Sequence, residues 1–170
     1  DSSKKVAEAR IQAPRSLWDP SYKENSWIAN DYLNDPIKLL PELKNKINNN
    51  YPGTKLAITE YYYGGGNHIS GALAQADVLG IFGREGVFAA NLWHLGNTDD
   101  RFIYGAFDMF RDYDGNDSKI GSLGIKALTN NNKNTSLYAG YKEGNRDKII
   151  AVALHKSDSE QRVLASFNSE

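Results

Sequence analysis

The spacing of hydrophobic residues changes along the chain, and this change divides it into two parts near residue 112. Up to Arg111, short apolar runs alternate with segments whose apolar residues recur at helical spacing. Alternating strand and helix patterns of this kind are typical of βαβ units around a parallel sheet. After that point, short apolar or alternating runs separated by polar loops predict antiparallel strands. We therefore expect an α/β part over residues 1–111 and part of a β-sandwich over residues 112–170.

The α/β part contains three predicted strands and three predicted helices. The strands are Arg10–Leu17, Lys55–Glu60 and Val87–Leu92, and the helices are Pro36–Asn50 with Asp35 as its cap, a helix that opens at Asn67 or His68, and Phe102–Phe110. An eight-stranded barrel needs about 250 residues. Three parallel strands would therefore be the last three βα units of a (β/α)8, TIM-like barrel, and the chain looks like a fragment. Because its sheet edge would be uncovered, we expect the isolated chain to be insoluble or molten.

The second part begins with an acidic turn, DYDGND, and continues as short strands. The predicted strands are Ser122–Thr129, Ser136–Tyr141, Lys148–His155 and Arg162–Phe167, which give one sheet with an unpaired inner face. The turn places Asp112, Asp114 and Asp117 close together and suggests calcium, but it lacks the EF-hand order of glycine at position six and glutamate at twelve. An acidic turn between two domains is the favoured interpretation. We expect no catalytic cofactor, and no motif supports a structural calcium ion.

Composition and charge exclude several classes of function. Twenty basic and 21 acidic residues give a net charge of −1, without a basic stripe, so a nucleic-acid or membrane partner is disfavoured. No apolar run reaches the roughly 18 residues of a membrane span. Cysteine is absent, which excludes thiol chemistry and thiolate metal sites. The three histidines, His68, His94 and His155, do not have metal-ligand spacing. Absence of cysteine fits a protein secreted by a bacterium, although many cytosolic proteins also lack cysteine.

Glu60 is the strongest candidate for a reacting group. It ends an apolar run and is followed by three tyrosines and three glycines, in the order TKLAITEYYYGGGN. A charged residue where a buried parallel strand ends is typical of the active sites of α/β enzymes. Phenol groups of Tyr61, Tyr62 and Tyr63 could donate hydrogen bonds that keep the carboxylate ionised. The alternative is a structural acid satisfied by an arginine or by backbone N–H groups.

Three tryptophans are candidate sugar platforms. Trp18 and Trp93 follow predicted strands on the same side as Glu60, and Trp27 lies in the loop after WDP. Indole rings stack on the C–H face of a pyranose, whose hydroxyl groups need polar neighbours. Asp19, Asn91 and His94 could supply those neighbours, although Asp19 in its WDP context looks more like a positioning residue. The alternative, strongest for Trp18, is that these rings cover the core.

A strand followed by GGGN and a helix could also hold phosphate at the helix N-terminus. However, no Lys-Ser/Thr pair follows the glycines, and the GxGxxG spacing is absent. An ionised Glu60 beside the loop would repel an anion. The phosphate-binding interpretation therefore ranks low.

The segments RSLWDP with ENSWI, ITEYYYGGGN and FAANLWHL together resemble glycoside hydrolase family 44, the endo-β-1,4-glucanases and xyloglucanases. The resemblance implies a (β/α)8-like barrel joined to a β-sandwich, of which this chain would hold strands six to eight and part of the sandwich. It implies retaining hydrolysis of internal β-1,4-glucosidic bonds of plant polysaccharides. RSLWD would fall at the sixth strand.

By that match Glu60 is the nucleophile at the end of the seventh strand, and Trp27 and Trp93 line the substrate cleft. Candidate substrate-binding residues beside them are Tyr62, Trp18, Asp19 and His94. The family's acid/base glutamate ends the fourth strand, which is not in this sequence. The partners expected are therefore a β-1,4-glucan and the remaining, N-terminal part of the same enzyme, and the chain alone should be inactive. The alternatives are a non-catalytic glycan-binding module and a phosphate-binding α/β domain.

Overall fold

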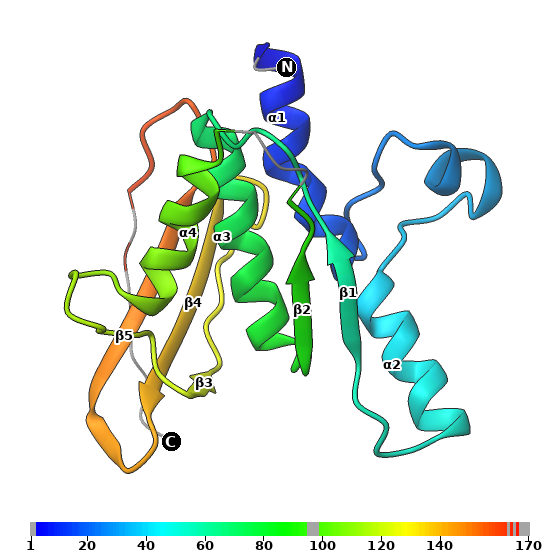
Figure 1. Ribbon diagram of the computed structural model, residues 1–170. Helices are drawn as coiled ribbons and strands as arrows, with labels where there is room; N and C mark the ends of the chain where they lie inside the picture. The colour runs from blue at the N-terminus through cyan, green and yellow to red at the C-terminus, as the bar shows by residue number, and fades with distance from the viewer. Residues whose placement is uncertain (1–2, 95–98, 163, 165, 167–170) are drawn as a thin grey trace.

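Two small sheets lie on either side of a central helix (Figure 1). The computed structural model describes residues 3–94, 99–162, 164 and 166. Strands β1 (Ala57–Tyr61) and β2 (Ala89–Leu92) form a parallel pair, and β3 (Leu123–Ile125), β4 (Thr135–Lys142) and β5 (Asn145–His155) form an antiparallel sheet in that order. The helices are α1 (Lys4–Gln12), α2 (Leu39–Asn50), α3 (Ile69–Arg84) and α4 (Arg101–Arg111).

Helix α3 is the centre of the core. Its side chains Ala76, Val78, Ile81 and Phe82 belong to one buried cluster. Residues of the antiparallel sheet belong to the same cluster, and residues of β1 and β2 pack against it. The Phe82 ring meets the ring of Tyr61 edge-on, with centroids 5.2 Å apart. Because other elements surround α3, more than one of its faces is buried. An ordinary surface helix buries only a single apolar stripe.

A buried polar cluster ties α3 to the antiparallel sheet. The Lys156 ammonium lies 3.0 Å from Asp77 Oδ2, and both side chains are 1% exposed. The Tyr138 hydroxyl donates to Asp77 Oδ1 at 2.6 Å. Burial, followed by the charge of Asp77, raises the pKa of Tyr138 well above its usual value, so this phenol stays protonated and remains a donor. The two parts of the sequence thus share one core, and their division at residue 112 stays a prediction.

The strand predicted at Arg10–Leu17 is wrong. Helix α1 runs to Gln12, and a 3₁₀ helix follows over Ala13–Leu17 with Pro14 in its first turn. The segment before Gln12 is rich in alanine and charged helix formers, and proline is tolerated at a helix start because its missing N–H would have no partner there. Within the described residues the parallel sheet therefore has two strands rather than three.

The other predicted elements, apart from the strand at Arg162–Phe167, are confirmed with altered limits. Helix α2 begins at Leu39 instead of Pro36, because Lys38 takes a left-handed conformation (φ 48°). Asp35 does not cap this helix but accepts a hydrogen bond from the Lys38 ammonium at 2.8 Å. His68 caps α3 by accepting from the Ser70 N–H. The predicted strand Arg162–Phe167 lies partly outside the described residues, and its described positions belong to no strand.

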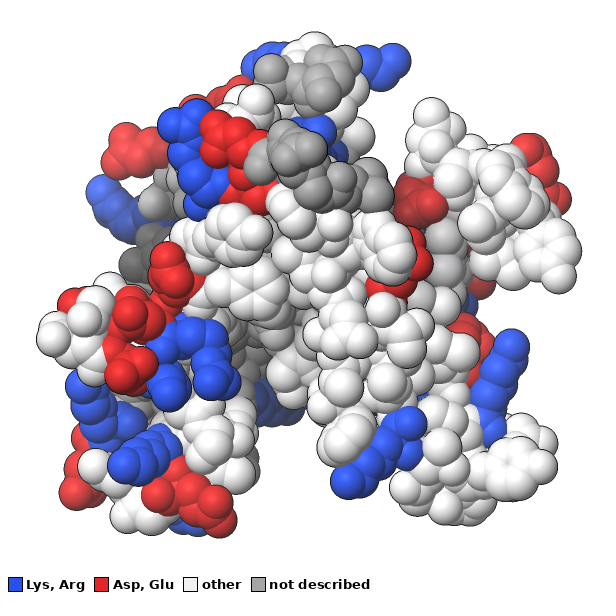
Figure 2. Space-filling view, in the orientation of Figure 1, with Lys and Arg blue, Asp and Glu red and all other residues white. Residues whose placement is uncertain are grey.

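The parallel pair is covered on one face only. Each residue of β1 and β2 is either exposed or half-buried and none is fully buried, whereas the strands of a parallel sheet are usually covered on both faces. Figure 2 shows charged side chains of both signs around the margin of one side of the molecule and uncharged side chains across its middle. Among the helices that the structure describes, none has the length and apolar character of a bilayer span.

Candidate functional site

A β-bulge turns Glu60 toward the open face of the sheet. The register pairs Ile58 with Ala90 and Tyr61 with Leu92, so three steps on β1 (58 to 61) oppose two on β2 (90 to 92). Ile58 and Tyr61 pack against the core, while Glu60 and the residue before it are exposed. Bulges often re-aim a side chain beside an active site. Within the described residues no hydrogen bond or ion pair engages the Glu60 carboxylate.

The three tyrosines after Glu60 do not support its carboxylate as the sequence suggested. The Tyr61 hydroxyl accepts from Gln75 Nε2 at 2.9 Å, and the Tyr62 hydroxyl donates to Asp100 Oδ1 at 2.8 Å. Tyr63 packs against the core, and burial raises the pKa of its phenol. Successive side chains of an extended segment point to opposite faces, so Tyr61 points away from the face of Glu60, while the Tyr62 hydroxyl is bound to Asp100. The carboxylate depends instead on solvent or ligand.

The glycines after β1 allow a close approach of neighbouring segments. A Cβ atom on Gly66 would lie 1.8 Å from Asp100 Oδ1, so only glycine fits there. Gly65 has φ +72°, and a Cβ atom on it would lie 2.8 Å from the Arg10 guanidinium. Arg10 Nε also donates to the Tyr63 carbonyl at 3.1 Å. Helix α1 therefore fixes the turn that follows Glu60, a role for Arg10 that the sequence analysis missed.

Trp93 is the tryptophan that the structure places at the same end of the parallel pair as Glu60. The backbone N–H of Trp93 donates to the Tyr61 carbonyl at 3.0 Å, and this bond extends the parallel ladder by one residue. Its indole is 51% exposed, and it shares the outward-facing positions of this strand with Asn91. An exposed indole and an exposed carboxylate thus stand at the same ends of two adjacent strands.

The other two tryptophans have different surroundings. Trp27 is 68% exposed and precedes a π-helical turn at Ile28–Tyr32. No ring contact within the described residues joins it to Trp93. Trp18 follows the 3₁₀ helix rather than a strand, packs against the core, and carries the Arg84 guanidinium 4.0 Å from its ring centroid. For Trp18 this environment favours the core-covering interpretation.

The Asp19 carboxylate is buried and forms its hydrogen bonds with neighbouring residues of the same turn. It is 2% exposed, and it accepts hydrogen bonds from Arg15 Nε at 2.8 Å and from the Ser21 N–H and hydroxyl at 2.8 and 2.6 Å. Burial alone would raise the pKa of Asp19, but the hydrogen bonds from Ser21 and Arg15 outweigh it and lower the pKa. Its role as a positioning residue fits this geometry, and substrate binding by Asp19 stays a prediction.

His94 and Tyr62 meet at one buried carboxylate. His94 Nδ1 and the Tyr62 hydroxyl bind the two oxygens of Asp100, whose side chain is 1% exposed. Sequence reasoning placed His94 and Tyr62 in the site but missed Asp100, since nothing in the local pattern shows that a residue so far along the chain returns to β1. Substrate binding by His94 and Tyr62 remains a prediction.

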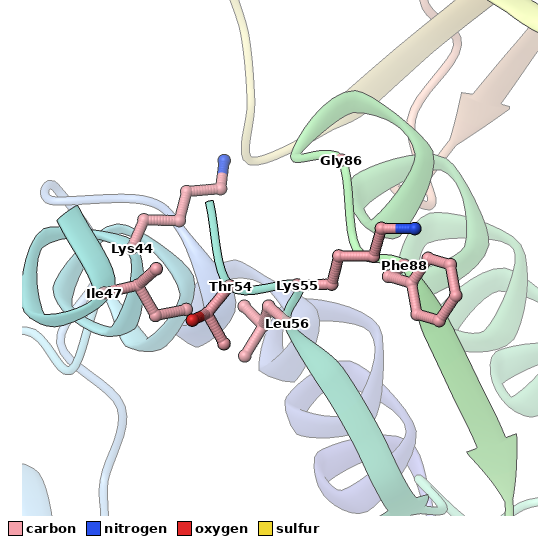
Figure 3. A pocket seen from close by; sticks show the side chains of 7 residues that line it. All are labelled: Lys44, Ile47, Thr54, Lys55, Leu56, Gly86 and Phe88. Carbon is pink, nitrogen blue, oxygen red and sulfur yellow. The ribbon is translucent and has the colours of Figure 1, made fainter. Parts of the chain in front are cut away.

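A hollow of the described surface lies away from Glu60 (Figure 3). It has a volume of about 320 Å³ and is lined by α2 and by the segments that precede β1 and β2, including Lys44, Lys55 and Phe88. These residues stand at the amino ends of the two strands, opposite Glu60. No carboxylate lines this hollow, so it offers no acid or nucleophile for glycoside hydrolysis.

The acidic turn uses its carboxylates to hold the backbone. Asp114 Oδ1 accepts from the Asn116 N–H at 3.0 Å, and Asp112 Oδ1 accepts from the Asp117 N–H at 2.6 Å. Among the residues that the structure describes, no three His, Cys, Asp or Glu side chains converge as a metal site would require. The expectations about cofactors and calcium stay predictions.

No family model matches the chain, but individual proteins are similar to it. Endoglucanase A from Paenibacillus lautus is 47% identical over 150 residues, which make up 88% of this chain and 21% of that protein. A family 44 endoglucanase from Clostridium acetobutylium superimposes with a TM-score of 0.89 at 41% identity, covering 94% of this chain and 31% of that one. A family 44 xyloglucanase from Paenibacillus polymyxa, solved with xyloglucan, gives 0.84 at 42%, covering 91% and 30%.

The chain thus spans about a fifth of the length of the curated relative and less than a third of those solved structures. Within those limits sequence and fold agree over about nine-tenths of its own residues. The chain is therefore similar, in sequence and in fold, to a part of the glycoside hydrolase family 44 enzymes.

Proposed function

We propose that this chain is part of a retaining endo-β-1,4-glucanase in which Glu60 is the nucleophile. The observation that carries the proposal is the bulge that exposes Glu60 at the end of β1, without an ion pair in the described residues. The exposed indole of Trp93 stands at the same end of the adjacent strand. A carboxylate nucleophile must be ionised and reachable by the anomeric carbon. An open face beside an indole ring meets the second requirement.

The reaction would proceed in two displacements. A Glu60 oxygen attacks the anomeric carbon, the bond to the leaving sugar breaks, and a second carboxylic acid protonates the leaving oxygen. That second group, now a carboxylate, then takes a proton from water, which attacks the same carbon and releases Glu60. The two carboxyl groups of retaining enzymes stand about 5–5.5 Å apart. We assign the second one to a part of the enzyme outside this chain.

The open face of β1 and β2 suggests how the rest of the enzyme would be arranged. We propose that further parallel strands continue this pair into a (β/α)8 barrel and that β3–β5 belong to a β-sandwich. The uncovered sheet face supports this arrangement, and so does the small share of the family 44 structures that the chain covers. A polymeric glucan is too large to enter a cell, so we also propose that the enzyme is secreted.

The two alternatives differ in how they use the same elements. In a glycan-binding module Trp93 would hold the sugar and Glu60 would only accept a hydrogen bond. In a phosphate-binding domain the N-terminus of α3 would hold an anion, but the Ser70 N–H there already donates to the ring of His68. The exposed Glu60 favours the hydrolase over both.

We expect Trp93→Ala to weaken glucan binding. In the complete enzyme, KM for cellohexaose should rise about tenfold, which corresponds to about 1.4 kcal/mol, because a stacking surface is lost. Phe88→Ala is the matched control, since Phe88 is 63% exposed but stands at the opposite end of β2. Steady-state kinetics on both variants decide: equal KM values for the two would remove Trp93 from the substrate site.

A further inference from the structure

We propose that Asp100 is a positioning residue of the glucan site, which holds Tyr62 and His94 in fixed orientations at the ends of β1 and β2. The inference rests on the proposed function and adds to it a residue that contacts no sugar itself. It is carried by the hydrogen-bond geometry around one buried carboxylate.

Each oxygen of Asp100 binds a different side chain. The Tyr62 hydroxyl donates to Oδ1 at 2.8 Å, and His94 Nδ1 forms a short hydrogen bond to Oδ2. The Asp100 side chain is 1% exposed, whereas that of His94 is 34% exposed. A charged-group hydrogen bond shielded from water is stronger and more directional than one at the surface. The buried carboxylate therefore restrains two residues that border the open face.

The backbone places Asp100 at this point. It immediately precedes α4, and the Phe102 N–H donates to the Gly66 carbonyl at 3.0 Å. A Cβ atom on Gly66 would clash with the Asp100 carboxylate. The His94 ring is also flanked by the Tyr104 ring of α4, with centroids 6.5 Å apart. The start of α4 and the glycine turn after β1 thus form the walls of a pocket for one carboxylate.

The carboxylate also selects the form of the imidazole. An ionised carboxylate only accepts hydrogen bonds, so neutral His94 must carry its proton on Nδ1 and present Nε2 as an acceptor. The second oxygen requires the Tyr62 phenol to act as donor. Asp100 thus determines which atom of each of these two side chains donates a hydrogen bond.

Asp100→Asn tests the inference because it keeps the shape but leaves a single acceptor oxygen. The amide can accept from Tyr62 or from His94 but not from both. In the complete enzyme we expect kcat/KM for cellohexaose to fall on the order of 10- to 100-fold, with the melting temperature nearly unchanged. Asp99→Asn is the matched control, since Asp99 is exposed and pairs with Arg101 instead. It should leave kcat/KM unaltered.

A spectroscopic readout separates positioning from mere structural support. The ¹⁵N signals of the His94 imidazole should change in Asp100→Asn and stay as in the wild type in Asp99→Asn.

Tyr62→Phe removes one of the two contacts, and its effect on kcat/KM should be less than additive with that of Asp100→Asn, since both act through one network. Unchanged His94 signals, or kcat/KM equal to that of the control, would overturn the role of Asp100. Failure of the wild-type enzyme to cleave any β-1,4-glucan would instead overturn the proposed function, on which this role rests.

Discussion

Replacing Glu60 with Gln in the complete enzyme is expected to lower kcat on β-1,4-glucan by on the order of 10⁴-fold or more. The amide has nearly the shape of the carboxylate but is not a nucleophile, so the glycosyl-enzyme cannot form. Because Glu60 is exposed and takes no part in an ion pair within the described residues, the substitution should cost little stability. Glucan binding, measured by calorimetry, should stay within a few-fold of the wild type.

The matched control is Glu85→Gln. Glu85 follows α3 and pairs with Lys44 at 2.7 Å and with Arg84 at 3.1 Å. Its substitution should lower the melting temperature without lowering kcat. If Glu60→Gln kept wild-type turnover, the chain would supply binding but not chemistry, and the glycan-binding alternative would stand.

The second large effect concerns stability. Asp77→Ala is expected to lower the free energy of unfolding by about 3–5 kcal/mol, because it leaves the Lys156 ammonium buried without its partner. The Tyr138 hydroxyl would lose its acceptor in the same step. The loss should appear as a lower urea midpoint of the complete enzyme, measured by circular dichroism.

The double variant Asp77→Leu/Lys156→Met separates the charge from the packing. Replacing a buried ion pair by apolar residues of similar volume is often neutral or stabilising. We therefore expect the double variant to recover most of the stability that Asp77→Ala loses. If Asp77→Ala alone were as stable as the wild type, this cluster would not hold α3 to the antiparallel sheet.

Local patterns predicted the elements on which Glu60 depends. The apolar run before Glu60 became β1, and the helical spacing after His68 became α3 with that histidine as its cap. The second parallel strand and its pairing with β1 followed from the strand–helix–strand order. These features depend on residues close in sequence, which is why the sequence shows them.

The sequence failed where the outcome depended on tertiary contacts or on competing local preferences. The segment Arg10–Leu17 contains apolar residues that fit a short strand, yet the helix-forming residues before it carry α1 forward to Gln12. The tyrosines after Glu60 were expected to bind its carboxylate. Instead, the hydroxyl groups of two of them form hydrogen bonds with Gln75 and Asp100. The bulge at Glu60 depends on the register with β2, which no single-strand pattern encodes.

The most direct test of the account is covalent labelling of the nucleophile. Incubation of the complete enzyme with a 2-deoxy-2-fluoro cello-oligosaccharide bearing an activated leaving group should trap the glycosyl-enzyme. The fluorine slows both steps, whereas the good leaving group speeds only the first, so the intermediate accumulates. Peptide mass spectrometry should then find the sugar on Glu60, within the sequence ITEYYYGGG. A stable label on any other carboxylate, or turnover without label at Glu60, would contradict the assignment of Glu60 as the attacking group.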